Sequence, residues 1–171
     1  MGTPLFAALI VLVLFVLLAL FARGGPTETL SASGLPPEAA AVSKLELTEL
    51  SSVCARLFSE LGFAVLEQET RSDRIDLRVE DPTPVTGQRV YIRCVPTPQA
   101  GAVQSAEVQA ALDTARGENL AKAVVVTPGP FSDEARLVSQ GTPVELIDGV
   151  QLAKLLRQHL PDVANRLGLP R

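Results

Sequence analysis

Two segments near the middle of the chain alternate apolar and polar residues, which is the pattern of half-buried β-strands. Residues 71–79 (RSDRIDLRV) place the carboxylate of Asp76 among arginines, and residues 88–95 (QRVYIRCV) carry Arg93 on their polar side. If the two strands pair as neighbours, Asp76 and Arg93 lie on one polar face of a sheet. A carboxylate that faces a second acid and a lysine can hold a metal ion that activates water, whereas one that faces an arginine forms an ion pair. The partner of Asp76 therefore decides which chemistry the site can perform.

The elements around this strand pair predict an α/β fold, a mixed sheet flanked by helices. Apolar residues recur at helical spacing from Leu47 to Leu61, Gly62 is suited to end that helix, and residues 63–69 follow as a first strand. The later strands are separated by helices, which predicts right-handed crossovers and parallel pairing between them. The elements expected after residue 95 are a helix over 105–116, a strand over 122–128, a short helix from Ser132 to Gly141, a strand over 144–148 and a last helix before Pro161.

The charge balance limits the partners. With 15 basic and 19 acidic side chains the net charge is −4, which argues against strong non-specific nucleic-acid binding, because that binding depends on neutralising phosphates with basic groups. Any contact with a nucleic acid is expected to be weak and to use the two arginine-bearing strands. The residues expected there are Arg74, Arg78, Arg89 and Tyr91.

Ligands for a resident metal or cofactor are sparse in the sequence. The two cysteines, Cys54 and Cys94, fall on the apolar sides of their predicted elements and are interpreted as buried thiols. The single histidine is His159, so the sequence lacks the His and Cys spacing of a metal cluster. No metal and no small-molecule cofactor is therefore expected, and Asp76 would be the ligand if any Mg²⁺ bound.

Residues 5–22 (LFAALIVLVLFVLLALFA) form an uncharged apolar run. As a helix this run is about 27 Å long, close to the thickness of a bilayer's hydrocarbon core. No basic residue precedes it, unlike a signal peptide, so we interpret it as a single-pass membrane anchor. Arg23 and Lys44 follow it, which predicts a cytoplasmic location for the folded part. The expected organisation is an anchor over 1–22, a flexible linker over 23–43, a folded domain over 44–160 and a tail over 161–171.

Several segments also match motifs of a known family. A helix ending in LGF (61–63), a strand with R-I-D-L (74–77) and a strand with Y-I-R-C-V (91–95) precede two more specific motifs. These motifs are T-P-G-x-F-S-x-E-A at 127–135 and L-I-D-G-x-x-L at 146–152. Together they resemble the Mrr-type restriction endonuclease domain of the PD-(D/E)xK nuclease superfamily. The resemblance implies a restriction-endonuclease-like fold and cleavage of DNA with Mg²⁺ held by acids beside a lysine.

Most of the catalytic positions that the resemblance implies are replaced in this chain. Asp76 matches the family's strand aspartate, but Arg93 and Val95 stand in place of the Gln and Lys of a Q-x-K motif. Ser51 stands in place of a helix glutamate, with Glu49 two residues away as a substitute. Arg93 adds a fixed positive charge where a metal ligand is implied, because arginine keeps its proton in proteins. The site is therefore interpreted as vestigial.

Three hypotheses follow from these residues. In the first, the chain is a membrane-anchored, catalytically inactive restriction-endonuclease-like domain that acts by binding DNA weakly or another protein. In the second, it is a metal-dependent endonuclease with rearranged ligands, Glu49 and Asp76 holding Mg²⁺. In the third, the domain is purely structural, its polar strand face is solvated surface, and Asp76 and Arg93 form a weak exposed ion pair.

Overall fold

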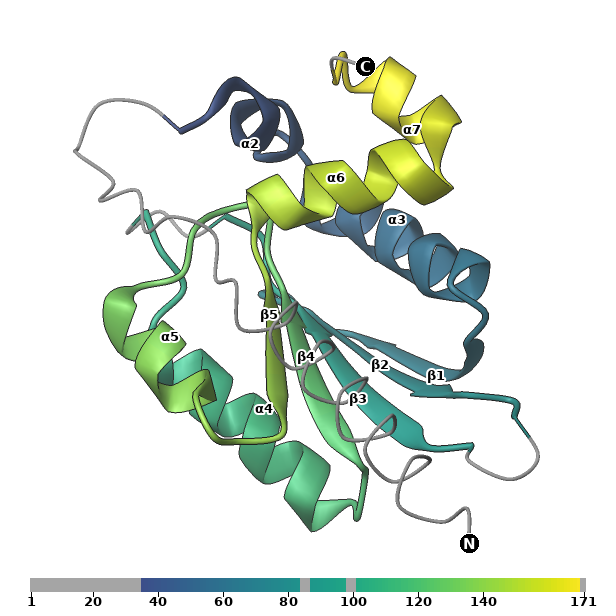
Figure 1. The fold of residues 1–171 in the computed structure, drawn as a ribbon, viewed down its shortest axis with the longest axis vertical. Helices are drawn as coiled ribbons and strands as arrows, with labels where there is room; N and C mark the ends of the chain where they lie inside the picture. Colours follow the sequence, from purple (N-terminus) through teal and green to yellow (C-terminus); the bar gives the residue numbers. More distant parts are fainter. Residues whose placement is uncertain (1–34, 84–86, 98–100, 170–171) are drawn as a thin grey trace, which may run out of the picture. The chain divides into compact units, whose positions relative to one another are not determined.

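A mixed five-stranded sheet is the centre of the part of the chain that the structure describes, residues 35–83, 87–97 and 101–169 (Figure 1). The structure is a computed structural model. In the order β1-β2-β3-β4-β5, the first three strands are antiparallel neighbours and the last three are parallel. The elements are α2 (Pro37–Val42), α3 (Leu47–Glu60), β1 (Ala64–Thr70), β2 (Ile75–Glu80), β3 (Arg89–Cys94), α4 (Ser105–Gly117), β4 (Lys122–Val126), α5 (Asp133–Ser139), β5 (Val144–Ile147), α6 (Gly149–His159) and α7 (Pro161–Arg166). The predicted α/β class and mixed sheet are confirmed.

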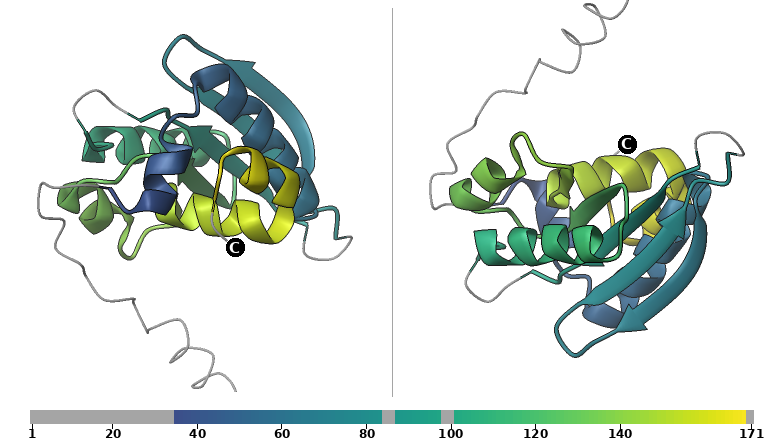
Figure 2. Two further views of the ribbon diagram at one scale, coloured as in Figure 1. Left: turned by 90° about the horizontal axis from the view of Figure 1, so that it is seen from above. Right: turned by 90° about the horizontal axis from the view of Figure 1, so that it is seen from below.

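Helices cover both faces of this sheet (Figures 1 and 2). The face with α2, α3, α6 and α7 buries Val90, Ile92 and Cys94 of β3, whereas the face with α4 and α5 buries Tyr91 and Val95. This alternation is the predicted one, because successive strand side chains point to opposite faces.

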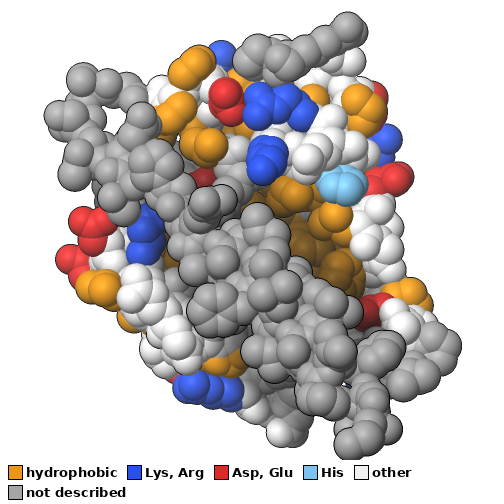
Figure 3. Space-filling model, in the orientation of Figure 1, with side chains coloured by type: hydrophobic (Ala, Val, Ile, Leu, Met, Phe, Trp, Pro, Cys, Tyr) orange, Lys and Arg blue, Asp and Glu red, His pale blue; other side chains and the backbone are white. Residues whose placement is uncertain are grey.

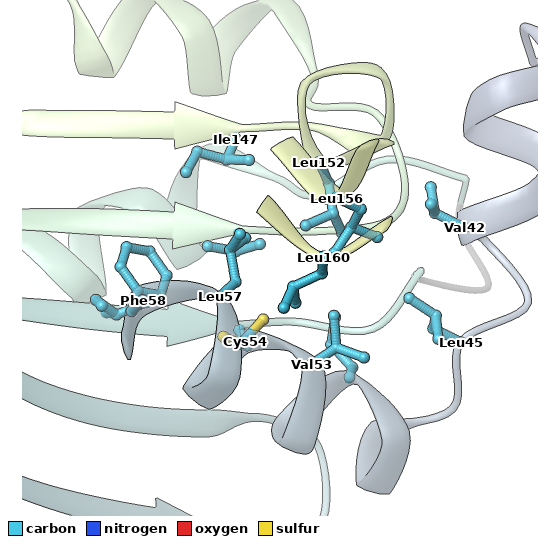
Figure 4. Packing of buried hydrophobic residues seen from close by; sticks show 14 of the residues in the cluster. Val42, Leu45, Val53, Cys54, Leu57, Phe58, Ile147, Leu152, Leu156 and Leu160 are labelled. Atoms are coloured by element: carbon cyan, nitrogen blue, oxygen red, sulfur yellow. The ribbon is translucent and has the colours of Figure 1, made fainter. Parts of the chain in front are cut away.

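Helix α3 packs on the sheet through the apolar stripe that its sequence predicts. Leu50, Cys54 and Leu57 are fully buried, and the helix leads into Gly62, whose positive φ of 91° favours glycine. Figure 4 shows Cys54 and Leu57 in the same apolar cluster as Leu160, which follows α6. Cys54 and Cys94 are both free and buried, as expected.

The ends of the folded unit differ from the prediction. The compact unit begins at Leu35, and α2 lies inside the segment expected to be linker, with Ala39 and Val42 buried. Residues 161–169 are not a tail, because α7 and Leu169 pack into the core. Both helices have only six residues and begin at a proline, so their apolar runs are too short to show helical periodicity in the sequence. Packing on the core stabilises them, because helices this short are not stable alone.

The predicted membrane anchor over residues 5–22 lies outside the described residues. Among the residues that the structure does describe, no helix combines the length and the apolar character needed to cross a bilayer.

Candidate functional site

The pairing of β2 with β3 brings Asp76 and Arg93 together, as predicted. The antiparallel register places the two residues directly opposite each other, on the face that α4 covers. Arg93 Nε donates a hydrogen bond to Asp76 Oδ1 at 3.2 Å, and each side chain is only 5% exposed. The hypothesis of a solvated ion pair is therefore wrong for these two residues, which form a buried pair.

Helix α4 packs over the face of the sheet that carries Asp76 and Arg93, and its Glu107 supplies a second carboxylate for Arg93. Arg93 Nη1 donates to Glu107 Oε2 at 3.4 Å, and Arg93 Nε and Nη2 donate to Tyr91 Oη at 3.1 and 2.8 Å. The guanidinium carbon also lies 5.5 Å from the centre of the Tyr91 ring. Burial, together with a hydrogen bond to Asp76, raises the pKa of Tyr91 to about 12. The phenol therefore stays neutral inside this cluster.

The second carboxylate oxygen of Asp76 faces two further arginines. Arg74 Nε lies 3.4 Å from Asp76 Oδ2, and Arg71 Nε lies 3.7 Å from the same oxygen. Arg71 also pairs with Glu69 at 2.8 Å, and β1 places Glu69 opposite Asp76. Both oxygens of Asp76 thus lie beside guanidinium groups, which donate charge-assisted hydrogen bonds to a carboxylate.

The residues expected to contact a nucleic acid are engaged within the protein. Arg78 forms two hydrogen bonds with Glu118, at 2.7 and 2.6 Å, and its guanidinium lies 5.9 Å from the centre of the Tyr91 ring. Arg89 pairs with Glu80 at 3.2 Å. Tyr91 is fully buried, so its expected role as a stacking platform for a base is not available in this fold. Any nucleic acid at these strands would compete with carboxylates for the arginines.

The other positions implied by the family motif lie on different faces of the sheet: Val95 is on the face covered by α4, whereas Ser51 and Glu49 belong to α3. Val95 is buried in the apolar cluster with α4 and α5, where it contributes no charge. Ser51 lies on α3 at the opposite face and accepts a hydrogen bond from Gln68 Nε2 at 2.7 Å. Glu49 is about 200° around the helix from Ser51 and pairs with Arg166 of α7 at 3.1 Å. The structure therefore does not bring Glu49 together with Asp76.

The donor set around Asp76 does not fit a divalent metal. Such ions need several oxygen ligands, and the described residues hold no group of three His, Cys, Asp or Glu side chains able to bind one. Lys122 does not restore the missing lysine, because it lies opposite Val90 at the start of β3 and pairs with Glu145 at 2.8 Å. The described side chains around Asp76 therefore form a cluster of ion pairs centred on the buried Asp76 and Arg93.

Three residues of the site region were not predicted from the sequence. Glu107 and Glu118 resemble ordinary helix-terminal acids, and Gln68 resembles an ordinary polar strand residue. The one signal for Glu107 was its place in the first turn of α4, on the helix that crosses over the polar strand face.

Comparisons with known proteins agree with this architecture. A family model described as a restriction endonuclease, the Mrr catalytic domain, matches residues 42–156. The chain is similar to the DNA modification-dependent restriction endonuclease AspBHI, at 18% identity and a TM-score of 0.50, over 88% of this chain and 47% of that one. It is also similar to the MspJI restriction endonuclease in complex with a 27-mer oligonucleotide, at 23% identity and a TM-score of 0.45, over 77% and 30% of the two chains. The chain thus spans less than half the length of AspBHI. No curated protein matches it.

Proposed function

Because the chain belongs to the Mrr-type restriction endonuclease family, we propose that it is a catalytically inactive member that acts through binding, with DNA as its first candidate partner. The observation that carries this proposal is the burial of Arg93 against Asp76, at the position where the family motif implies a metal ligand. A guanidinium there supplies neither a ligand for Mg²⁺ nor a group that can lose a proton. Val95 removes the lysine that would stabilise charge in the transition state.

In this proposal the chain binds DNA weakly, and the affinity falls as the salt concentration rises. The arginines of β2 and β3 pair with acids, and on the face seen in Figure 3 the basic and acidic side chains are interspersed. Each phosphate contact must therefore displace a carboxylate, which lowers the affinity. Arg89 is the arginine of β3 best placed for such a contact, because its side chain is 63% exposed.

The experiment is a cleavage and binding assay on the full chain, with and without Mg²⁺ or Mn²⁺ at stated salt concentrations. We expect no cleavage by the natural sequence. The variant with Ser51→Glu, Arg93→Gln and Val95→Lys, which carries the residues of the family motif, is the comparison for cleavage. Metal-dependent cleavage by the natural sequence that Asp76→Ala abolishes would overturn the inactive assignment.

The binding arm compares two exposed arginines that each pair with an acid. Arg89→Ala should weaken DNA binding and lower the slope of log affinity against log salt by about 1, the loss of one phosphate contact. Arg56, on α3, pairs with Asp162, and Arg56→Ala should leave binding unchanged. Absence of binding at low salt, or equal losses in both variants, would remove DNA as a partner at these strands.

Membrane anchoring through residues 5–22 is part of the same proposal. The length and the apolar character of this run support it. Arg23 and Lys44 support a cytoplasmic position for the folded unit. Extraction with alkaline carbonate tests the anchor: the full chain should stay with the membrane, and a chain without residues 5–22 should be released. Protection of the folded unit from protease added to the cytoplasmic side would contradict the orientation.

A further inference from the structure

Helix α6 differs in charge from the other described helices. It contains Lys154, Arg157 and His159 but no Asp or Glu, whereas each of the other helices in the described part of the chain includes at least one acid. Arg157 pairs with Glu38 of α2 at 3.1 Å, and Lys154 is exposed and forms no ion pair with a described residue. The outer face of α6 is therefore basic, in a chain whose net charge is −4.

Apolar side chains are exposed beside this basic face. Val150, in the first turn of α6, is 41% exposed, and Leu35, the first residue of the folded unit, is 37% exposed. Helix α2 follows Leu35 and packs against α6, and Figure 3 shows Lys and Arg side chains over α6 next to hydrophobic side chains toward α2. The nearby acid Asp148 is paired with Arg136 at 3.2 Å. We call Leu35, Val150 and Lys154 with the outer face of α6 the α6 surface.

The chain enters the folded unit at this surface. Residues 23–34 separate Leu35 from the apolar run over 5–22, and a segment of this length spans at most about 40 Å in any conformation. With residues 5–22 in a bilayer, the folded unit stays within that reach of the lipid headgroups. Its contact with the headgroups is then intramolecular, so even weak contacts suffice to hold it there.

We propose that the α6 surface docks on a membrane leaflet that carries anionic lipid. Lys154 contacts headgroup phosphates, while Leu35 and Val150 enter the boundary between headgroups and acyl chains, as basic and apolar side chains do at lipid interfaces. This inference rests on the proposed membrane anchoring and adds a second contact, made by the folded unit. The cytoplasmic leaflet carries anionic lipid, which agrees with the proposed orientation. Because the rest of the chain is acidic, repulsion disfavours other faces at the same leaflet.

Amine labelling of the full chain in lipid nanodiscs tests the proposal without any substitution. Discs of phosphatidylcholine, with or without phosphatidylglycerol, are treated with an amine-acetylating reagent, and mass spectrometry follows each lysine. Lys154 should react about fivefold more slowly in discs with phosphatidylglycerol, the gain in affinity of one lysine at an anionic surface. High salt should remove this difference, because it screens the surface charge. Lys122 is the internal reference, since it lies at the start of β4 and pairs with Glu145, and its rate should not change.

Two substitutions of exposed apolar residues form a matched pair. Val150→Ser should reduce the slowing at Lys154, whereas Leu66→Ser, at a residue of β1 that is 50% exposed, should keep it. Equal rates for Lys154 in the two kinds of disc, equal slowing of Lys154 and Lys122, or equal effects of the two variants would each overturn the proposal. Slowing of Lys154 by duplex DNA in discs without phosphatidylglycerol would assign the α6 surface to nucleic acid instead.

The same experiment separates docking from anchoring. Incorporation into discs of phosphatidylcholine alone reports the anchor, because these discs offer no anionic lipid to the α6 surface. A chain that enters them but shows no lipid-dependent difference at Lys154 contradicts docking and leaves the anchor intact. A chain that enters neither kind of disc contradicts the anchor and, with it, the docking that depends on it.

Discussion

Removing the carboxylate of Asp76 should destabilise the fold far more than removing an exposed carboxylate on the same strand. In Asp76→Ala the Arg93 guanidinium keeps its bonds to Tyr91 and to Glu107 but loses its one fully buried anionic partner. Loss of one partner from a buried ion pair costs about 3–5 kcal/mol of unfolding free energy. Because Glu107 remains beside the guanidinium, we expect the lower end of this range, about 3 kcal/mol.

A double-mutant cycle isolates the pair itself. Arg93→Met keeps an unbranched side chain of similar length without charge, and Asp76→Ala with Arg93→Met removes both charges at once. The double variant should cost less than the sum of the single variants, with a coupling energy of about 2–3 kcal/mol, because each single variant leaves a buried charge that has lost its buried partner, and the double variant leaves neither charge. The same cycle on Glu80 and Arg89, which are 38% and 63% exposed, should give less than about 1 kcal/mol.

The measurement is urea-induced unfolding of the full chain in non-ionic detergent, followed by far-ultraviolet circular dichroism. Unchanged slopes with urea concentration would show that the variants alter stability rather than the unfolded state. A coupling energy for Asp76 and Arg93 no larger than that for Glu80 and Arg89 would refute the reasoning, since it would mean that solvent screens the central pair.

Two further predictions concern the surroundings of this pair. Burial raises the pKa of the sole tyrosine, Tyr91, to about 12; stability should be intact below about pH 10 and should fall by roughly 2–3 kcal/mol as the pH rises through about 12. Absorbance titration of the phenol checks this, Tyr91→Phe should remove the dependence, and a midpoint near the ordinary value would contradict it. A Cβ at Gly149 would overlap the carbonyl oxygen of Pro128, so Gly149→Ala should lower the unfolding free energy by roughly 1–3 kcal/mol. Gly117→Ala in α4, where the added carbon meets nothing, should be neutral or stabilising by up to about 1 kcal/mol, and equal melting of the two variants would argue against the close approach.

The sequence predicted the elements of the fold well where local rules apply. Ser132 and Asp148 cap α5 and α6 with their side chains, as their positions before helical segments indicate. The two helices that sequence reasoning missed, α2 and α7, are each only six residues long. Such short helices form because they pack on α6 and on the core, and no local pattern reports that packing.

The sequence predicted the contact between Asp76 and Arg93 at the centre of the candidate site, but it did not predict the residues that surround this pair. Asp76 and Arg93 follow from strand parity and from neighbouring strands in register. Glu107 does not follow, because its contact with Arg93 depends on where α4 crosses the sheet. Glu49 was a plausible ligand by distance along the chain, yet the phase of α3 turns it toward Arg166.

By itself the sequence determined which side chains share a face, because the two-residue period of a strand is a local property of the backbone. It also determined that three of the four catalytic positions implied by the family resemblance, the glutamine, the lysine and the helix glutamate, are replaced in this chain, since identity at a position needs no structure. Only the tertiary structure decided that the face with Asp76 and Arg93 is closed to solvent. Burial arises from the packing of α4 over β2 and β3, a contact between segments distant in sequence, and that burial turns an ordinary cross-strand ion pair into a buried one with Glu107 of α4 beside it.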